Sequence, residues 1–297
     1  MIDTVLCRQA FCPDPIKRIN TMKFSILIAH YNNGNFFKEC YDSLLMQTYQ
    51  NWEAIIVDDA STDDSLLQIR SLTKNDSRFR LYVNETNQGC GYTKRKCMEF
   101  ASGEICAFLD PDDALYTQAI ESSVNAFRQN SEIVAAYSKF MICDKFLNPL
   151  QVFKNSKQIY NSPHFFNTHI QISHFFSFTK EAYFKTSGIN AALFNAVDQD
   201  LYLKILEVGN PKFINEVLYR YRTHSNGISQ YKSKKSVKES FSKVILETMH
   251  RRKLQKIANK KIPVRYSNSE EIYSLLDYQD NIFYRTYIRL KILFNRL

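Results

Sequence analysis

The sequence contains little glycine and no long hydrophobic run. Its 297 residues include only 7 Gly, which argues against a glycine-rich barrel, and they contain no internal repeat. No segment reaches about 18 uninterrupted apolar residues, so the sequence predicts no membrane-spanning helix. The first 21 residues lack the apolar centre of a secretion signal. We therefore expect a cytoplasmic protein.

The cysteines form no recognisable set of metal ligands. There are 7 of them, scattered along the chain, and none belongs to a CxxC pair. Short cysteine spacings are typical of structural zinc sites, so no zinc site is predicted. Several cysteines lie inside apolar patterns, which indicates buried thiols in a reducing compartment.

Apolar runs alternate with helical patterns along the first half of the chain. Helices are expected between and after these runs, with apolar residues at helical spacing. This order predicts an α/β fold with a mostly parallel central sheet and helices on both faces. The predicted strands are Phe24–Ala29, Trp52–Val57, Phe79–Val83, Ile105–Leu109 and Ile133–Phe140.

The composition changes twice along the chain. Residues 1–21 contain Pro13 and Pro15 and no sustained period, so we expect a poorly ordered N-terminal extension. Residues 22–230 carry the α/β pattern and form the predicted catalytic domain. Residues 231–297 are predicted to form a basic helical C-terminal region, where most of the net charge of +9 is concentrated.

Acidic clusters follow two of the predicted strands. Asp110, Asp112 and Asp113 end one strand, and Asp58-Asp59 ends another. Buried carboxylates need a cation, and oxygen ligands favour Mg²⁺ or Mn²⁺ over zinc. The carboxyl ends of parallel strands meet at one sheet edge, where ligands bind. Taken alone, the cluster of Asp110, Asp112 and Asp113 is better explained as an Asp-rich turn, and turn or helix-capping chemistry explains Asp58-Asp59 equally well.

Three blocks of sequence together are more specific than any single cluster. They read FSILIAHYNN, LLMQTYQNWEAIIVDDASTDDS and NQGCGYTKRKCMEFASGEICAFLDPDDAL. Their spacing resembles that of family-2 glycosyltransferases with the A-type, Rossmann-like nucleotide-sugar fold. The resemblance runs from about Lys23 to about Ser229. It implies an inverting glycosyltransferase that moves a sugar from a nucleotide diphosphate donor, most simply a UDP-sugar, to an acceptor hydroxyl.

The same resemblance implies a nucleotide-sugar site. Asp59 would contact the nucleobase, with the backbone near Ala29 and Tyr31 beside it. Lys94-Arg95 stands where relatives carry an Arg-Asn pair, so a cation is kept near the diphosphate. Which of the two reaches the diphosphate stays open.

The family's DxD motif falls on Asp110 and Asp112. The resemblance implies that Asp110 belongs to the nucleotide-sugar site and that Asp112 holds Mn²⁺ or Mg²⁺, with Asp113 able to share or replace that role. The segment YRYRTHSNGIS matches a family segment in which His224 would join the metal or the diphosphate. Arg222 would face the phosphates with its fork of donors.

The block NAVDQDLYLKIL resembles the one that holds the family's catalytic base. Val197 stands where relatives have Glu, and Asp198 keeps the next position. Asp198 is therefore expected to take the proton of the acceptor hydroxyl. The alternative is that Asp198 only caps the following helix. Asp200, two positions on, would point elsewhere.

Two other functions remain open at this point. Val197 favours a degenerate nucleotide-sugar binding protein without turnover. A nucleotidyltransferase could use a similar metal and nucleotide site, but the first loop, HYNNGN, has one Gly and makes a poor phosphate cradle.

The C-terminal region forms a basic amphipathic pattern that the resemblance does not cover. Phe283, Tyr287, Leu290, Phe294 and Leu297 make one helical stripe, and Arg285, Arg289 and Arg296 fall on the opposite side. Such a helix could lie on an anionic membrane beside a saccharide or lipid-linked saccharide acceptor. It could instead pack on the protein or in a homodimer, and Ile288 and Ile292 favour burial. Nucleic acid is not expected, because the basic residues lack interleaved aromatics.

Overall fold

The computed structural model describes residues 22–224 and 234–294. The predicted extension 1–21, the predicted domain boundary near residue 230, and Arg296 and Leu297 of the C-terminal helix lie outside these ranges. No helix in the described ranges is both long and apolar enough to cross a membrane.

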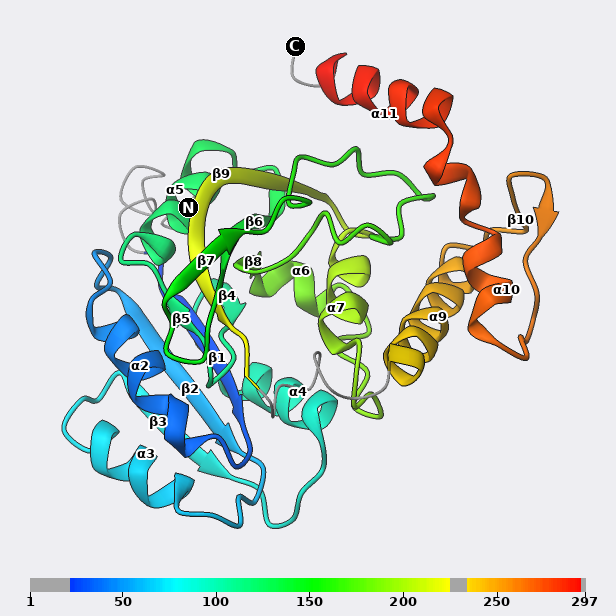
Figure 1. Cartoon of the computed structure of the whole chain (residues 1–297). Helices are drawn as coiled ribbons and strands as arrows, with labels where there is room; N and C mark the ends of the chain where they lie inside the picture. The colour runs from blue at the N-terminus through cyan, green and yellow to red at the C-terminus, as the bar shows by residue number, and fades with distance from the viewer. Residues whose placement is uncertain (1–21, 225–233, 295–297) are drawn as a thin grey trace, which may run out of the picture.

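A nine-stranded sheet forms the centre of the described molecule (Figure 1). The first four strands in sheet order lie parallel to one another, as the apolar runs predicted. They are β3 (Phe79–Val83), β2 (Trp52–Asp58), β1 (Phe24–His30) and β4 (Ile105–Phe108). The prediction of an α/β fold with a mostly parallel sheet is confirmed.

The other strands make the sheet mixed. Strand β8 (Phe176–Thr179), which the sequence did not predict, runs antiparallel to both β4 and β6. Beyond β8 the order continues through β6 (Ile133–Cys143), β9 (Asn210–Arg222) and β5 (Ala114–Leu115), while β7 (Pro149–Val152) pairs with β6. Because β8 is antiparallel, its first residue lies at the same sheet edge as the last residues of β1, β2 and β4.

Two hydrophobic layers cover the two faces of the sheet. Alternate residues of β1, such as Ile26 and Leu27, point into different layers. One layer is covered by α2 (Gly34–Leu45), α3 (Ser65–Thr73) and α5 (Ala119–Gln129). The other is covered by α4 (Cys90–Phe100), α6 (Lys180–Phe184) and α7 (Val197–Ile205). Cys40, Cys97 and Cys106 are free, buried thiols in these layers, and Cys143 is a free, buried thiol in a separate small cluster with Ala114 and Leu147.

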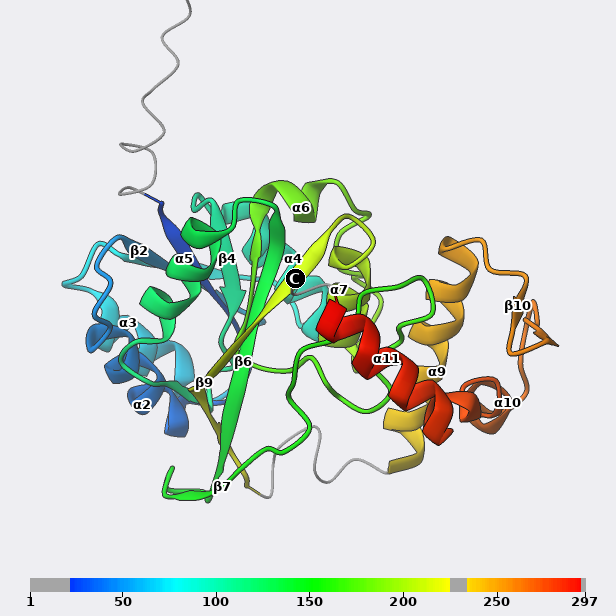
Figure 2. The same cartoon turned by 90° about the horizontal axis from the view of Figure 1, so that it is seen from above.

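Helix α9 packs beside α7, and α10 packs on α9 (Figures 1 and 2). Helix α9 (Lys234–Arg251) and α10 (Ser269–Ser274) share a hydrophobic cluster with Phe166 of the α/β domain. Between them lies a hairpin of β10 (Lys256–Ile257) and β11 (Lys260–Lys261). The helices α9 and α10 are therefore structural parts of the molecule.

Arginines at the end of α9 bind the α/β domain. Arg251 Nε lies 2.7 Å from Glu207 Oε2, and Arg252 Nε lies 3.2 Å from Glu207 Oε1. Arg252 Nη1 also donates to the carbonyl oxygen of Phe165 at 2.6 Å. Part of the basic charge predicted for an external partner thus forms contacts within the molecule.

Helix α11 (Ile282–Phe294) is different, because none of its described residues is buried. The side chains of Phe283 and Phe294 are 81% and 65% exposed, so the predicted apolar stripe faces solvent. Ile288 and Ile292 are only partly exposed. A short 3₁₀ helix, Asp277–Asp280, connects α11 to α10.

Candidate active site

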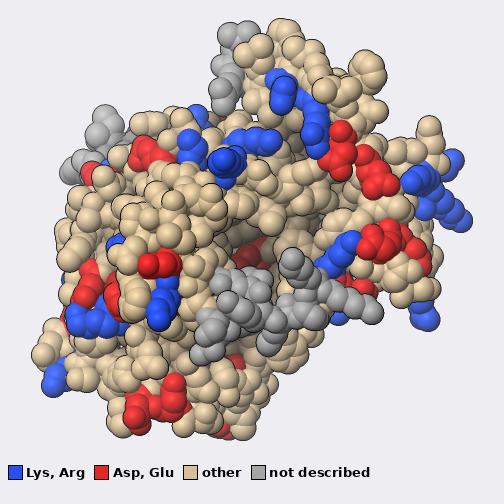
Figure 3. Space-filling view, in the orientation of Figure 1, with Lys and Arg blue, Asp and Glu red and all other residues tan. Residues whose placement is uncertain are grey.

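The candidate site lies in a hollow at the carboxyl edge of β1, β2 and β4, and Figure 3 shows acidic side chains at the floor of such a hollow. The DxD turn follows β4 there, β8 begins there, and the first turn of α7 approaches from the side of the second hydrophobic layer. Every side chain discussed below reaches this edge or the loops around it.

Lys94 joins two of the predicted site residues. Its Nζ lies 2.7 Å from Asp198 Oδ1 and 3.2 Å from Asp110 Oδ1, and its side chain is only 4% exposed. Burial alone would lower the pKa of Lys94, but the charges of Asp110 and Asp198 outweigh burial and raise it well above its ordinary value. Lys94 is therefore a permanent cation between the DxD turn and α7. The sequence left Lys94 and Arg95 as alternatives, and Arg95 instead donates to the carbonyl oxygen of Ile189.

A glycine allows this meeting of α4 and the loop before α7. The N–H of Gly91 donates to the carbonyl oxygen of Leu193 at 2.9 Å. A Cβ atom at Gly91 would lie 2.5 Å from that same oxygen, too close for any side chain. The close approach brings the start of α4, and with it Lys94, to Asp198.

Asp198 and Asp200 have different surroundings, although both lie in the first turn of α7. The N-cap residue of α7 is Ala196, and no side chain caps the helix, so Asp198 does not act as the cap. The side chain of Asp198 is 33% exposed and binds Lys94. Asp200 is fully buried and accepts from Lys204 Nζ at 2.7 Å and from the N–H of Asn190 at 2.9 Å. Asp198 can meet a ligand, whereas Asp200 holds the loop before α7.

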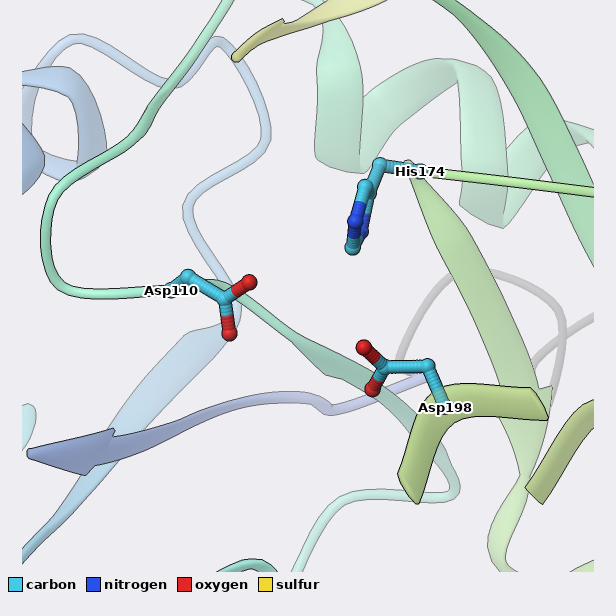
Figure 4. A group of neighbouring side chains, drawn as sticks. All are labelled: Asp110, His174 and Asp198. Carbon is cyan, nitrogen blue, oxygen red and sulfur yellow. The ribbon is translucent and has the colours of Figure 1, made fainter. Parts of the chain in front are cut away.

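His174 completes this group, and the sequence analysis did not predict it. Ligand atoms of Asp110, His174 and Asp198 all lie within 4.8 Å of one another, and Figure 4 shows the imidazole directed between the two carboxylates. Only the antiparallel pairing of β8 with β4 brings His174 to this edge. Sequence patterns could not identify His174, because a lone His before a short apolar run is not distinctive and the pairing of β8 with β4 is not visible in the sequence.

Asp112 and His224 form a second acidic and imidazole pair. His224 Nε2 lies 2.8 Å from Asp112 Oδ2, and the Asp112 side chain is 19% exposed. The ring of Phe36 packs against His224, with 4.5 Å between the ring centroids. A carboxylate and an imidazole at this distance are suitable ligands for Mn²⁺ or Mg²⁺ when diphosphate oxygens and water complete the shell.

Asp113 and Arg222 hold the DxD turn from inside. Asp113 Oδ2 accepts from the Tyr219 hydroxyl at 2.6 Å, and Oδ1 accepts from the N–H of Arg222 at 2.7 Å. Burial, followed by the charges of Asp112 and Asp110, raises the pKa of Asp113 well above its ordinary value. The Arg222 guanidinium donates to the carbonyl oxygens of Asp112 and Lys145. These bonds direct Arg222 toward the backbone of the turn, while its contact with phosphates stays a prediction.

The predicted nucleobase side of the site is built around Asp59. Its carboxylate accepts from Asn84 Nδ2 at 2.7 Å and from the backbone N–H groups of Gln88 and Gly89 at 3.0 and 2.7 Å. A carboxylate offers about four acceptor positions, so one remains for a nucleobase N–H. Ala29 is partly exposed and Tyr31 is 44% exposed beside it on the chain. Their contact with a nucleotide stays a prediction.

The buried pair of His30 and Asp58 fixes the loops on this side. His30 Nδ1 lies 2.9 Å from Asp58 Oδ2, which also accepts from the Ser61 hydroxyl at 2.6 Å. The Ser61 hydroxyl in turn accepts from the N–H of Asn32 at 2.9 Å. The loops after β1 and β2 are thus tied together below the predicted nucleobase.

Within the part of the chain that the structure describes, two groups of residues could hold a divalent cation, but they differ in charge. A cation on Asp110, His174 and Asp198 would share both carboxylates with the Lys94 ammonium. Unit charges 4 Å apart interact by about 4 kcal/mol at an effective dielectric constant of 20, and a divalent ion doubles this repulsion. The Asp112 carboxylate pairs instead with the His224 imidazole, while the Arg222 guanidinium donates to the carbonyl oxygen of Asp112. A cation at Asp112 and His224 would not share its carboxylate with Lys94, which contacts Asp110 and Asp198. The DxD turn therefore fits a metal better at Asp112 than at Asp110.

The model of the glycosyl transferase family 2 matches residues 25–185. The chain belongs to glycosyl transferase family 2. The matched range contains β1 to β8, the DxD turn and Lys94, whereas Asp198, Arg222 and His224 lie beyond it. The family assignment confirms the resemblance that the three sequence blocks indicated.

Longer and shorter relatives in the family are similar to this chain. A chondroitin synthase of Escherichia coli is 32% identical over 236 residues, which cover 78% of this chain and 33% of that protein. The chain therefore spans about a third of the length of this relative. The UDP-Glc:alpha-D-GlcNAc-diphosphoundecaprenol beta-1,3-glucosyltransferase WfaP of E. coli is 28% identical over 220 residues, covering 73% of this chain and 83% of WfaP.

A solved structure supports the fold. Residues 1–349 of Staphylococcus aureus TarS, in complex with UDP-GlcNAc, superpose with a TM-score of 0.64 at 21% identity. The match covers 77% of this family-2 chain and 66% of the TarS chain. Identity at this level is evidence for a shared fold alone.

Proposed function

We propose that this chain is an inverting glycosyltransferase that moves a sugar from a UDP-sugar donor to an acceptor hydroxyl. The observation that carries the proposal is the shared contact of Lys94 with Asp198 and Asp110. It holds a partly exposed carboxylate beside the DxD turn, at the sheet edge where ligands bind in open α/β folds.

The reaction needs one proton acceptor and one stabilised leaving group. Asp198 takes the proton of the acceptor hydroxyl as its oxygen bonds to the anomeric carbon. The bond between that carbon and the diphosphate oxygen breaks, and its electron pair leaves with the UDP. Lys94 is a fixed positive charge close to both events, which stabilises negative charge without reorganisation. No covalent intermediate is needed.

The proposed metal ligands are Asp112 and His224. Bound Mn²⁺ or Mg²⁺ would neutralise the charge that develops on the diphosphate. The 2.8 Å contact between Asp112 Oδ2 and His224 Nε2 supports this assignment, as does the partial exposure of the Asp112 side chain. The internal bonds of Asp113 argue for a structural role of that residue.

The proposed donor and acceptor follow from the family relatives. WfaP is named as acting on UDP-Glc and on a lipid-linked GlcNAc diphosphate, and the E. coli relative is named a chondroitin synthase. We therefore propose a UDP-sugar donor and a saccharide or lipid-linked saccharide acceptor, in polysaccharide or glycoconjugate synthesis.

A panel of UDP-sugars tests the proposed function. We expect the chain with Mn²⁺ to release UDP from at least one UDP-sugar, and faster when saccharide acceptors are added. Binding of UDP-sugars without any turnover would instead support a degenerate binding protein, the alternative that Val197 suggests. Release of pyrophosphate from a nucleoside triphosphate and a sugar phosphate would indicate a nucleotidyltransferase.

Helix α11 is the proposed membrane contact, and it would keep a cytoplasmic enzyme at the membrane surface. Its exposed side chains include Phe283, Leu290 and Phe294, and the basic side chains of Arg289 and Lys291 lie on the same helix. The exposed side chains of Ile282 and Leu293 widen the apolar sector beyond the predicted stripe. At about 100° per residue, Arg289, which was predicted on the opposite side, therefore falls at one border of this wider sector and Lys291 at the other. Apolar residues bordered by basic ones favour binding to anionic lipid, with about 1 kcal/mol for each nearby Lys or Arg.

Flotation with phosphatidylglycerol vesicles at low salt tests this contact. The full chain should float with the vesicles. A chain ending at Asn281 should still fold, because α11 contributes no buried residue to the core, but it should no longer float. Phe283→Ser with Leu290→Ser should have the same effect, whereas Leu67→Ser, on an exposed site of α3, should not. If the full chain remains in the soluble fraction, the membrane proposal is wrong. If the full chain then has the mass of a dimer and the shorter chain has the mass of a monomer, α11 forms the contact of a homodimer.

A further inference from the structure

The segment that carries His174 is anchored by its neighbours, Phe175 and strand β8. In the antiparallel pairing of β4 and β8, Ala107 lies opposite Ser177. Strand β8 begins at Phe176, two residues after His174. On the other side, the N–H of Phe175 donates to the Ser138 hydroxyl at 3.1 Å. The position of His174 relative to the DxD turn is therefore set by the sheet.

The orientation of the imidazole is set by aromatic side chains. The ring stacks on Tyr219, with centroids 4.7 Å apart and planes at 18°, and lies nearly parallel to Tyr221 at 6.1 Å. The edge of the ring meets Phe140 at 6.2 Å. Tyr219 is itself anchored, because its hydroxyl donates to Asp113 and accepts from the N–H of Asp110. The ring plane is thus linked to the DxD turn.

The ring nitrogens of His174 remain available to a ligand. Among residues 22–224 and 234–294, neither imidazole nitrogen has a hydrogen-bond partner. His174 lines a small pocket together with Asp198, and the other lining residues are Phe108, Phe176, Leu201 and Tyr202.

The charges around His174 argue for a sugar hydroxyl rather than a metal. Lys94 already neutralises Asp110 and Asp198 from its own side, so a divalent cation at the same carboxylates would meet an ammonium ion. A neutral hydroxyl meets no such repulsion, and it can give its proton to Asp198 while a neighbouring oxygen of the same sugar accepts from an imidazole N–H.

We propose that His174 is an acceptor-binding residue that hydrogen-bonds the acceptor sugar and orients the hydroxyl that Asp198 deprotonates. The proposal rests on the proposed function and adds to it a residue for the acceptor side. His174 takes no proton and forms no bond to the sugar. Its contribution is position, which controls how often the attacking oxygen meets the anomeric carbon.

The test separates transfer to a sugar from transfer to water. The full chain with Mn²⁺ is given the UDP-sugar that it uses best, with or without a short-alkyl GlcNAc diphosphate as acceptor. His174→Phe keeps an aromatic ring for stacking and removes both ring nitrogens. We expect His174→Phe to lower kcat/KM for the acceptor about tenfold or more, while UDP affinity and hydrolysis of the donor change less than about threefold.

Two further variants control the experiment. His174→Gln restores an N–H donor and should recover part of the transfer, which a merely structural role would not allow. His164→Ala removes an exposed histidine far along the loop and should behave as the unmodified chain does.

Three results would overturn the proposal. Normal transfer by His174→Phe would show that His174 does not bind the acceptor. Equal loss of transfer, hydrolysis and Mn²⁺-dependent UDP affinity would make His174 a metal ligand. An unmodified chain that neither transfers nor hydrolyses any nucleotide sugar would refute the proposed function itself, and the proposal with it.

Discussion

Asp198→Asn is expected to lower turnover by about 10²- to 10⁴-fold, the usual contribution of a general base. Affinity for UDP should stay within about threefold, because the amide keeps the shape of the side chain and Lys94 keeps Asp110 as a partner. Steady-state kinetics and calorimetric titration of UDP measure the two quantities. A large loss of turnover without a loss of UDP affinity is the result that identifies a general base.

Asp200→Asn is the matched control for that experiment. Both residues lie in the first turn of α7, but Asp200 is buried against Lys204. Removing one partner of a buried ion pair costs about 3–5 kcal/mol, so Asp200→Asn should lower the melting temperature, which Asp198→Asn should not. Near-normal turnover of Asp198→Asn would deny its role as the base. A large loss of stability would mean that the Asp198 side chain is structural.

Asp112→Asn is expected to remove the effect of metal on the enzyme. For the unmodified chain, Mn²⁺ should strengthen UDP binding, because a cation held by Asp112 would neutralise negative charge on the diphosphate. The variant should bind UDP equally with Mn²⁺ and with EDTA, and its turnover should fall by about 10²-fold or more. Titration of UDP under both conditions measures this directly.

Two control variants help to interpret the metal experiment. Asp113→Asn disturbs a buried carboxylate that accepts from Tyr219 and Arg222, so it should lower stability but leave the metal effect in place. Asp64→Asn changes an exposed residue before α3 and should have no effect. Equal UDP affinity of the unmodified chain in Mn²⁺ and in EDTA would contradict the metal assignment.

Local sequence patterns were sufficient for the strands with strong apolar runs. Phe79–Val83 was predicted with its observed bounds, and the other parallel strands differ by a few residues at their ends. The carboxylates at the ends of these strands were predicted for the same reason, because parallel strands bring their carboxyl ends together. The DxD turn and Asp198 needed only that rule and the family resemblance.

Residues whose place depends on non-local pairing could not be predicted. Strand β8 has four residues, and its position between β4 and β6 depends on partners far away in the chain. His174 reaches the site only through that pairing. Arg222 shows a related limit, since its spacing fits a phosphate contact but tertiary structure directs it to the carbonyl oxygens of Asp112 and Lys145.

The position of Lys94 between two carboxylates has a consequence for the order of events. When Asp198 accepts a proton, it loses its charge, and Lys94 loses one of its two counter-ions. The positive field of Lys94 then acts mainly on the side of Asp110, where the diphosphate departs. Deprotonation of the acceptor and departure of UDP would thus reinforce each other through one ammonium group.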